Sequence, residues 1–442
     1  MNDLERSIPP QIHDITSCEL QVPLLYSIAN KIPVALFKNP NLELIHLLVK
    51  IKAGALYEEI KYSSNATYQL LKESNPDFSA NDMDDFLSFH GTSWKTYINT
   101  QYITIRWIIP KKHLAKVMPI LWKTISEPVF KSDCLQRFKE SRIKDLEYNS
   151  AKFNYRATQL MFSEMFPKDT PIGTVLTKEH IEVITIEQLQ KYHHQTFTKD
   201  NIRVFITGNI DDVMMRRLDD EMMHNSSPNL EGRQQQAEEV AKRSDTLAFS
   251  PFYPLLSPRT IIETRENALQ SSFILCKQNI GYNHPDRRNF EILSVLFGGY
   301  FGSRLMKKIR EEKGYTYGIF CGNLFYENTS IFFIEADVKV EKTKAAIKAC
   351  FKEMKLLHKD LVSDEELTLA KSYMLGELLR DVDSSVSYQK KYAYWNDFHL
   401  DEREMQEMVD SINNITPQTI QKLAKQYHVP EMFSKIVVGK MV

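Results

Sequence analysis

The sequence predicts an α+β protein built from two similar halves. Three observations support this fold class. The 442 residues exceed what one ordinary hydrophobic core holds, so at least two domains are expected. Stretches rich in β-branched and aromatic residues alternate with amphipathic stretches in both parts of the chain. A polar segment without either pattern separates these parts.

The overall composition is that of a soluble globular protein, with 43% hydrophobic and 26% charged residues and a mean hydropathy of -0.37. A formal net charge of -1 gives no electrostatic case for nucleic acid. No apolar run reaches the length of a transmembrane helix, and the N-terminus lacks the pattern of a signal peptide. We therefore expect a cytoplasmic protein without a membrane span. The five scattered cysteines form no CxxC motif and are expected to be small buried apolar residues.

In the first half, strands are predicted at 24–37 (in part), 42–53, 94–109 (as a pair) and 202–210. Helices are predicted at 64–73, 78–90, 111–125, 132–166, 186–197 and 211–223. Pro119 should kink or shorten the helix at 111–125, because proline has no amide hydrogen to donate. Thr185 and Gln188 have the spacing of a capping box at the start of the helix at 186–197.

The polar stretch 224–247 has the composition of a linker. We therefore predict a first domain at 1–225, a linker at 226–250 and a second domain at 251–442. In the second domain, strands are predicted at 272–278, 315–325, 330–340 and 433–439. Helices are predicted at 287–297, 303–313, 342–357, 363–379, 402–412 and 418–426. The repeated order of strand and helix indicates an internal duplication.

The segment 297–317, FGGYFGSRLMKKIREEKGYTY, is the most informative in the chain. Ser303 is expected to cap the helix at its N-terminus and Gly314 to end it. Leu305, Met306 and Ile309 share one apolar face at helical spacing. From their types alone, Arg310 is a cation at the carbonyl end of the helix and Tyr317 a half-buried strand residue.

This segment resembles the C-terminal domain of the M16 metallopeptidases, which include the insulinase, pitrilysin and mitochondrial-processing-peptidase enzymes. The resemblance rests on Gly-Gly-x-x-x-Ser-Arg-Leu followed by Ile-Arg-Glu-Glu-Lys-Gly-Tyr-x-Tyr, and extends more weakly over 20–442. It implies two homologous domains of the LuxS/MPP-like metallohydrolase type, each with an antiparallel-rich sheet packed with helices. It also implies that Arg310 and Tyr317 hold a substrate peptide.

The family also binds peptide by strand addition at a strand edge of the first domain. The resemblance places this edge at Ser93, Trp94, Lys95 and Thr96. Trp94 and Lys95 stand where the family prefers smaller or amide residues.

The catalytic zinc motif of the family, H-x-x-E-H, is absent from this sequence. That motif works because two imidazoles four apart on a helix reach one zinc ion and the glutamate accepts a proton from its water. Aligned from Gly54, the motif positions hold Thr67, Leu70 and Leu71, which can do neither. Glu147 lies near the expected third ligand, and the neighbouring pair of histidines at 193–194 points to two sides of its helix. We expect no metal in this chain.

The favoured hypothesis is a catalytically silent M16 subunit. It would pair with an M16 chain that has an intact H-x-x-E-H motif and carries the zinc, and would supply Arg310 and Tyr317 for peptide hydrolysis in trans. Arg310 would give charge-assisted hydrogen bonds to substrate carbonyls, and the Tyr317 hydroxyl could stabilise an oxyanion. The alternative is a non-enzymatic scaffold or peptide-binding protein of M16 fold. An independent metallopeptidase is a third, weaker interpretation, and a homodimer is the alternative to a heterodimer.

Overall fold

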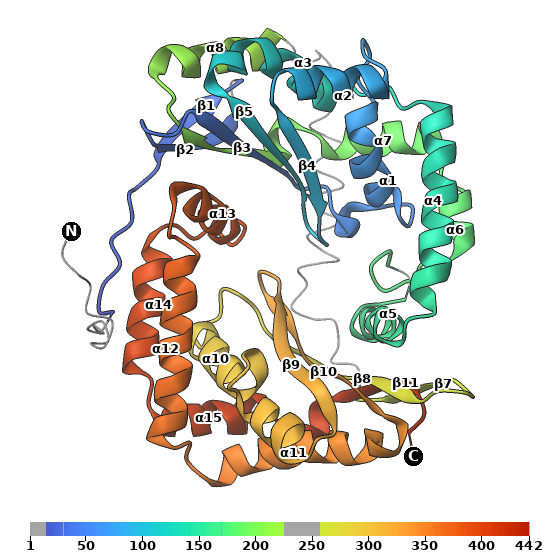
Figure 1. The fold of residues 1–442 in the computed structure, drawn as a ribbon, viewed down its shortest axis with the longest axis vertical. Coiled ribbons are helices and arrows are strands. Elements are labelled where there is room, and N and C mark those ends of the chain that lie inside the picture. Colours follow the sequence, from blue (N-terminus) through green and yellow to red (C-terminus); the bar gives the residue numbers. More distant parts are fainter. Residues whose placement is uncertain (1–14, 30, 169, 225–256, 442) are drawn as a thin grey trace, which may run out of the picture.

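The computed structural model describes residues 15–29, 31–168, 170–224 and 257–441. It contains two mixed sheets, each packed with helices, one above the other in Figure 1. The predicted α+β fold class is therefore confirmed. The predicted linker, 226–250, lies outside the described residues.

The first sheet has six strands in the order β1-β2-β6-β3-β5-β4. These are β1 Leu24–Ile28, β2 Ile32–Lys38, β3 Leu44–Ile51, β4 Ser93–Ile98, β5 Ile103–Pro110 and β6 Ile202–Gly208. The helices of this half are α1 Ser63–Leu70, α2 Ala80–Phe89, α3 Leu114–Ser126, α4 Ser132–Ser150, α5 Phe153–Met165, α6 Lys178–Glu182, α7 Ile186–Thr196 and α8 Asp212–His224. The predicted capping box of Thr185 and Gln188 is present at the start of α7.

The second sheet has five strands in the order β7-β11-β8-β10-β9. These are β7 Thr260–Thr264, β8 Gln270–Ile280, β9 Thr316–Phe325, β10 Thr329–Lys339 and β11 Ser434–Gly439. The helices are α10 Arg287–Ser294, α11 Thr343–Lys359, α12 Asp364–Arg380, α13 Ser385–Asn396, α14 Arg403–Asn414 and α15 Pro417–Tyr427. Two π-helical turns, η6 Val295–Gly299 and η7 Met306–Glu312, follow α10.

The two sheets share one topology. In the first, β2 pairs parallel with β6, and β6, β3, β5 and β4 then pair antiparallel in turn. In the second, β7 pairs parallel with β11, and β11, β8, β10 and β9 follow in the same antiparallel order. An identical order and direction of five strands indicates an internal duplication, which the repeated sequence pattern also predicts.

One helix from each half packs on the sheet of the other half. Helix α5, from the first half, packs its buried Ala157 and Met161 on β8 and β11. Helix α13, from the second half, packs Tyr388 and Tyr392 on Phe37 of β2. The exchange fixes the two sheets relative to each other, with their edge strands β4 and β9 pointing toward each other in Figure 1.

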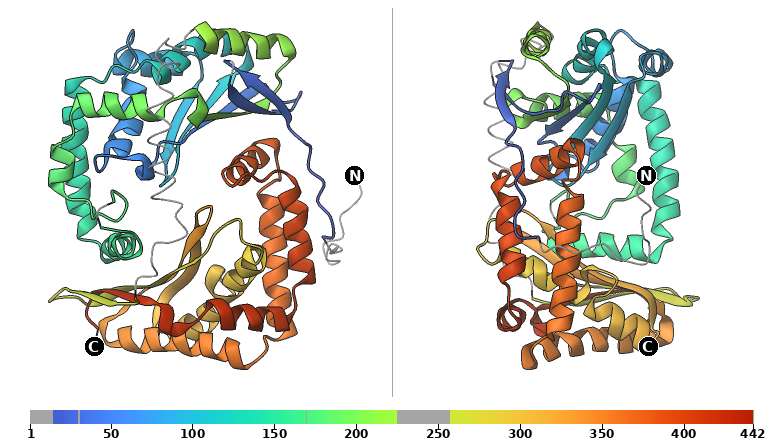
Figure 2. Two further views of the ribbon diagram at one scale, coloured as in Figure 1. Left: turned by 180° about the vertical axis from the view of Figure 1, so that it is seen from behind. Right: turned by 60° about the vertical axis from the view of Figure 1, so that its left-hand side comes forward.

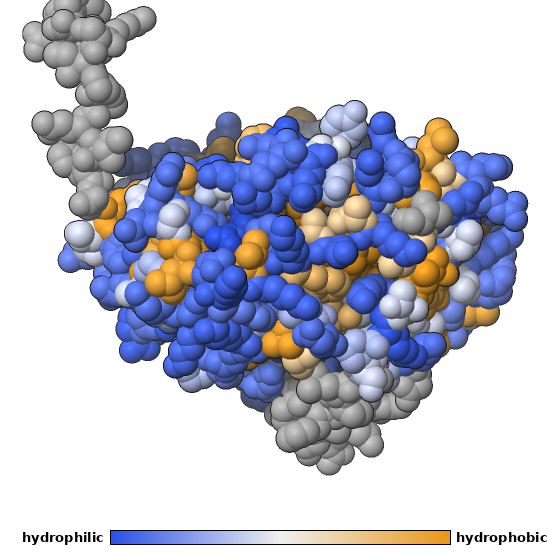
Figure 3. Space-filling view, turned by 90° about the horizontal axis from the view of Figure 1, so that it is seen from below, coloured by the Kyte–Doolittle hydropathy of each residue, from blue (hydrophilic) through white to orange (hydrophobic). Residues whose placement is uncertain are grey.

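A further link between the halves comes from the segment before β1. It runs down beside α14, as both views of Figure 2 show. The Cys18 amide and the Gln406 side chain of α14 are hydrogen-bonded at 3.0 Å. The outer face below α11 and α15 is largely hydrophilic, with hydrophobic side chains in smaller groups (Figure 3).

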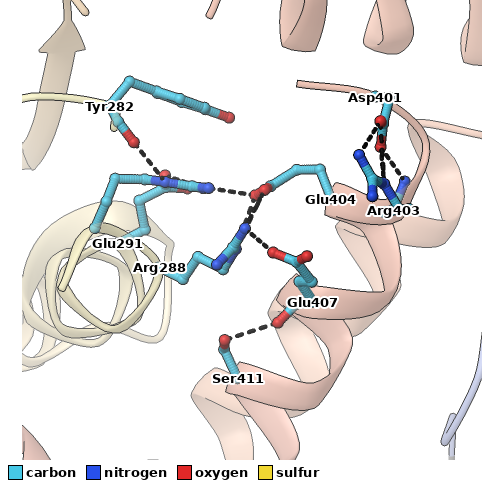
Figure 4. A network of polar contacts seen from close by, with 9 residues as sticks. Tyr282, Arg288, Glu291, Asp401, Arg403, Glu404, Glu407 and Ser411 are labelled. Carbon is cyan, nitrogen blue, oxygen red and sulfur yellow. Dashed lines mark hydrogen bonds and ion pairs between the residues drawn. The ribbon is translucent and has the colours of Figure 1, made fainter. Parts of the chain in front are cut away.

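A buried ionic network fixes α10 against α14 (Figure 4). The carboxylate of Glu404 accepts hydrogen bonds from Arg287 and Arg288, and Arg287 also pairs with Glu291 at 3.0 Å. Arg287 and Glu404 are both buried. Since buried charges are tolerated only when paired, this network rigidly supports the helical turns that follow α10.

Several sequence predictions differ from the structure, and helix α6 and strand β7 were not predicted. The helix predicted at 132–166 is two helices, α4 and α5, because α5 turns away to reach the second sheet. Helix α3 continues through Pro119 to Ser126, so Pro119 does not shorten it, and a kink there stays a prediction. Ser303 does not cap its helix with its side chain, since its hydroxyl is buried without a hydrogen-bond partner. Helix α13 was not predicted.

Candidate functional site

Arg310 lies on η7, which comes shortly before strand β9 of the second sheet. Leu305, Met306 and Ile309 are buried, which confirms the predicted apolar face of this segment. Gly314 has φ +60 and ends the helical segment, and its amide donates to the Arg310 carbonyl. The chain then enters β9, whose second residue is Tyr317.

Arg310 and Tyr317 are joined through the main chain. The Nε of Arg310 donates a hydrogen bond of 2.9 Å to the backbone carbonyl of Tyr317. The guanidinium also lies over the ring of Phe301, 4.4 Å from its centroid, and this contact orients it further. The Tyr317 side chain is 95% exposed, so it is not the half-buried strand residue that its type alone suggests.

A cavity of about 380 Å³ opens beside this pair. Its lining includes Asn154, Tyr300, Phe301, Phe320, Glu335 and Asp337. Glu335 and Asp337 are two apart on β10 and so share the face of the sheet that α5 covers. Burial, followed by repulsion from Asp337, raises the pKa of Glu335. The cavity therefore combines an aromatic wall with a carboxylate that partly resists ionisation.

The predicted peptide-binding residues Ser93, Trp94, Lys95 and Thr96 begin β4, the edge strand of the first sheet. The Trp94 ring packs edge-on against Trp107 of β5 at 5.3 Å. Lys95 is exposed. The structure thus places these residues at a strand edge, and peptide binding there stays a prediction.

The positions of the lost zinc motif do not fit a metal ion. Thr67 and Leu70 lie on α1 and Leu71 just after it, and all three are buried. Leu70 belongs to an apolar cluster with residues of α4 and α7, and the Thr67 hydroxyl has no hydrogen-bond partner. Glu147 is exposed on α4, and the His193 ring is buried against the Ile125 carbonyl. Within the described ranges, no three His, Cys, Asp or Glu side chains are placed to hold a metal.

The sequence alone did not identify the residues around Arg310, namely Phe301, Glu335 and Asp337. Phe301 could have been noticed as an aromatic residue between two glycines in the segment that resembles the M16 family. Glu335 and Asp337 carry no local signal, because only the register of β10 with β9 brings them to the cavity.

Across the described residues, no helix is both long and apolar enough to cross a membrane.

Comparison with known proteins gives a consistent family assignment. Residues 184–374 match the family described as Peptidase M16 inactive domain. The chain is 22% identical to the non-peptidase homolog YmxG of Helicobacter pylori, over 85% of this chain and 82% of that protein. It is 19% identical to the uncharacterized zinc protease YmxG of Bacillus subtilis, over 91% and 94% of the two chains.

Solved structures agree in fold. A peptidase M16 inactive domain from Pseudomonas fluorescens superposes with a TM-score of 0.78 at 16% identity, covering 95% of this chain and 98% of that one. A protease from Helicobacter pylori superposes with a TM-score of 0.77 at 14% identity, covering 95% and 100%. At these identities the likeness establishes the fold and no more.

Proposed function

We propose that this chain, whose residues 184–374 match the family described as Peptidase M16 inactive domain, is the non-catalytic subunit of a two-chain M16 peptidase. A partner M16 chain with an intact H-x-x-E-H motif supplies the zinc and the hydrolytic chemistry. This chain holds the substrate peptide with Arg310 and Tyr317. The cytoplasmic location predicted from the sequence belongs to the same proposal.

The observation that carries this proposal is the exposure of Tyr317. A tyrosine that served only the fold would bury its ring, whereas this one is 95% exposed beside a cavity and an arginine. Large exposed apolar groups mark interaction sites when they gather. Phe301 and Phe320 are also exposed and line that cavity, so the aromatic surface is continuous with it.

The chemistry of the pair suits a peptide backbone. Arg310 commits its Nε to the Tyr317 carbonyl, and its Nη1 lies 3.7 Å from Glu311. The remaining guanidinium hydrogens can donate to a substrate carbonyl as charge-assisted bonds. The exposed Tyr317 hydroxyl is a further donor, and in this proposal it contacts the substrate near the scissile bond. Neither group needs to change its charge for this role.

Loss of the zinc site supports the proposal that the partner chain carries the zinc and this chain binds the substrate. Thr67, Leu70 and Leu71 are packed as core residues, so these positions offer no ligands for the metal. An obligate partner should bury a large contact, on the order of 2,000 Å² or more in total.

The test begins with capture of the partner. The tagged chain is purified from its native host under mild conditions, and co-purifying proteins are searched for an M16 chain with H-x-x-E-H. The two chains are then reconstituted and assayed on unstructured peptides. Tyr317→Phe should reduce kcat by about 10²–10³, the usual cost of removing one oxyanion donor, with assembly unchanged. The exposed Tyr148 is the matched control, and Tyr148→Phe should retain full activity.

A scaffold or peptide-binding protein without a peptidase partner is the second candidate. It is favoured by the hydrogen bond from Arg310 to the Tyr317 carbonyl, which also gives Arg310 a purely structural role. Recovery of the chain as a monomer or homodimer without an M16 partner would support this candidate. Full peptidase activity of a complex carrying both Arg310→Ala and Tyr317→Phe would refute the role in trans.

A further inference from the structure

Two cations lie directly opposite each other at the edge of the first sheet. In the antiparallel pairing of β4 with β5, Lys95 is the cross-strand partner of Arg106. Directly opposed side chains lie on the same face of a sheet, and like charges there are mutually destabilising. Arg106 is also opposite Leu48 of β3, which packs with the core around α13. The two cations therefore face the space between the halves.

Within the part of the chain that the structure describes, this pair has no counter-ion. Neither Lys95 nor Arg106 forms an ion pair with any carboxylate in the described ranges. The Nε of Arg106 is buried and has no hydrogen-bond partner there. A buried guanidinium nitrogen without an acceptor is costly, because it loses its hydration and gains nothing in return.

Another cation, Lys390, acts together with Arg106 on the nearby His46. His46 of β3 has its pKa lowered by burial and then by the charges of Arg106 and Lys390. Lys390 belongs to α13 and is exposed. Two cations from two separate elements, Arg106 of β5 and Lys390 of α13, thus act on one imidazole. His46 itself leaves its Nδ1 buried and unpaired among the described residues.

This surface differs from two other contacts between the halves, where the cations are paired with carboxylates. Elsewhere between the halves the chain pairs its charges, as in Arg156 with Glu263 at 2.7 Å and Arg259 with Glu164 at 2.9 Å. Since no described carboxylate pairs with Lys95 or Arg106, the described residues leave this cluster free to take an anionic ligand.

The strand beside this cluster is open. β4 is the last strand of its sheet and uses one side for β5, so its other backbone edge can accept an added strand. An extended peptide added there would present alternate side chains to the face that carries Lys95 and Arg106.

We infer that β4 binds extended peptides whose face-forming residues are acidic, with Lys95 and Arg106 as the residues that select the carboxylates. The inference rests on the proposed peptide-binding function and specifies its substrate class. A carboxylate opposite this pair would relieve the repulsion between the two cations and give Arg106 the acceptor that it lacks. A net charge of -1 for the whole chain argues against a general polyanion site.

The test measures peptide binding directly on the purified chain. Three fluorescent decapeptides are compared by anisotropy: (Thr-Glu)₅, (Thr-Gln)₅ and (Thr-Lys)₅. We expect (Thr-Glu)₅ to bind at least about tenfold more tightly than (Thr-Gln)₅, the effect of one charge-assisted contact. Its affinity should fall when salt rises from 50 to 500 mM, because the contacts are ionic and partly exposed.

Variants locate the selectivity. Arg106→Gln and Lys95→Gln should each remove most of the preference for glutamate over glutamine. Lys95→Glu should shift the preference toward (Thr-Lys)₅, which a merely structural role of Lys95 does not predict. Lys348, exposed on α11 in the other half, is the matched control, and Lys348→Gln should leave all three affinities unchanged.

Backbone recognition is tested separately. In an added strand, only alternate residues turn their amides toward the protein. Two N-methylated forms of (Thr-Glu)₅ are compared, one methylated at all Thr amides and one at all Glu amides. One of the two forms should lose binding and the other should keep it. Equal loss from both, or tighter binding of a single-stranded DNA of equal charge, would overturn strand addition of an acidic peptide.

Failure of this inference is distinct from failure of the proposed function. Equal binding of the three decapeptides overturns acidic selectivity while leaving the activity test of Tyr317 untouched. Selective binding of (Thr-Glu)₅ by a chain that has no peptidase partner would support the inference and refute the role in trans.

Discussion

Lys50 of β3 forms a buried ion pair with Asp397, the residue that follows α13. The two side chains are only 9% and 8% exposed. The Lys50 ammonium also donates to the Ala393 carbonyl of α13 at 3.2 Å. Burial raises the pKa of Asp397 and Lys50 opposes this shift. The pair ties a strand of the first half to a helix of the second, so it helps fix the relative position of the two sheets.

Asp397→Asn should destabilise the protein by about 3–5 kcal/mol, because Lys50 then remains buried without a counter-ion. The measurement is the free energy of unfolding from urea titration at pH 7. Replacing both charges, Lys50→Met with Asp397→Leu, should restore most of the loss. If the double variant is as unstable as the single one, the uncompensated charge is not the cause.

Arg310→Ala should lower the free energy of unfolding by about 1 kcal/mol, since one hydrogen bond and one partly exposed cation–π contact are lost. Tyr317→Phe should leave it unchanged within about 0.5 kcal/mol, because the ring is exposed. Thermal and urea unfolding of the isolated chain check both values. A large loss from Tyr317→Phe would show that its hydroxyl has a structural partner.

Thr67→Val should stabilise the protein by about 1 kcal/mol. The two side chains have nearly the same shape, and the substitution removes a buried hydroxyl without a partner. Thr67→Ser is the control and should destabilise, because it keeps the hydroxyl and loses a buried methyl group. Equal stability of the valine variant would mean that the hydroxyl is satisfied in solution.

The purified chain should retain far less than one zinc ion after incubation with zinc and removal of excess metal by a mild chelator. The reason is that aliphatic side chains and one threonine occupy the positions of the zinc motif. Elemental analysis of the gel-filtered protein gives the stoichiometry. One tightly held zinc per chain, together with peptidase activity, would contradict the non-catalytic assignment.

Lys277 predicts a dependence of stability on pH. It is 5% exposed, and its ammonium has the Tyr427 carbonyl as a hydrogen-bond acceptor at 2.7 Å. Burial lowers its pKa from 10.5 to about 8. Between pH 8 and 10.5 the unfolded state therefore binds more protons than the folded state, and this group makes stability rise with pH.

Lys277→Met should accordingly be more stable than the unchanged protein at pH 7, where the buried ammonium is charged. The advantage should shrink by about 2 kcal/mol when the pH rises to 10, as the lysine loses its proton in the folded state. Urea unfolding of both proteins at the two pH values gives this difference. A constant advantage would show that Lys277 titrates normally.

Much of the fold could be predicted from local patterns. The helical period of Leu305, Met306 and Ile309 and the capping box at Thr185 depend on neighbours a few residues apart, and both are confirmed. The M16 resemblance rests on a contiguous segment, and the family comparison supports it. The missing H-x-x-E-H motif is also readable directly, because a ligand type is a property of the residue itself.

Other features required contacts between distant segments. Helices α5 and α13 each bury an apolar face against the sheet of the other half. The local sequence shows that such a face is apolar but not which sheet it will cover. Ser303 has the residue type of a helix cap, yet tertiary packing buries its side chain completely.

The sequence by itself determined the family, the two-half α+β plan and the loss of zinc ligands, since each depends on residue type and spacing. Only the tertiary structure decided which charges meet. Lys50 pairs with Asp397, which is 347 positions away in the sequence. Strand register sets Lys95 and Arg106 on one face, and the described residues provide them with no counter-ion. Charges pair only when their side chains are close in space. Tertiary packing and strand register set these distances, and the local sequence does not encode them.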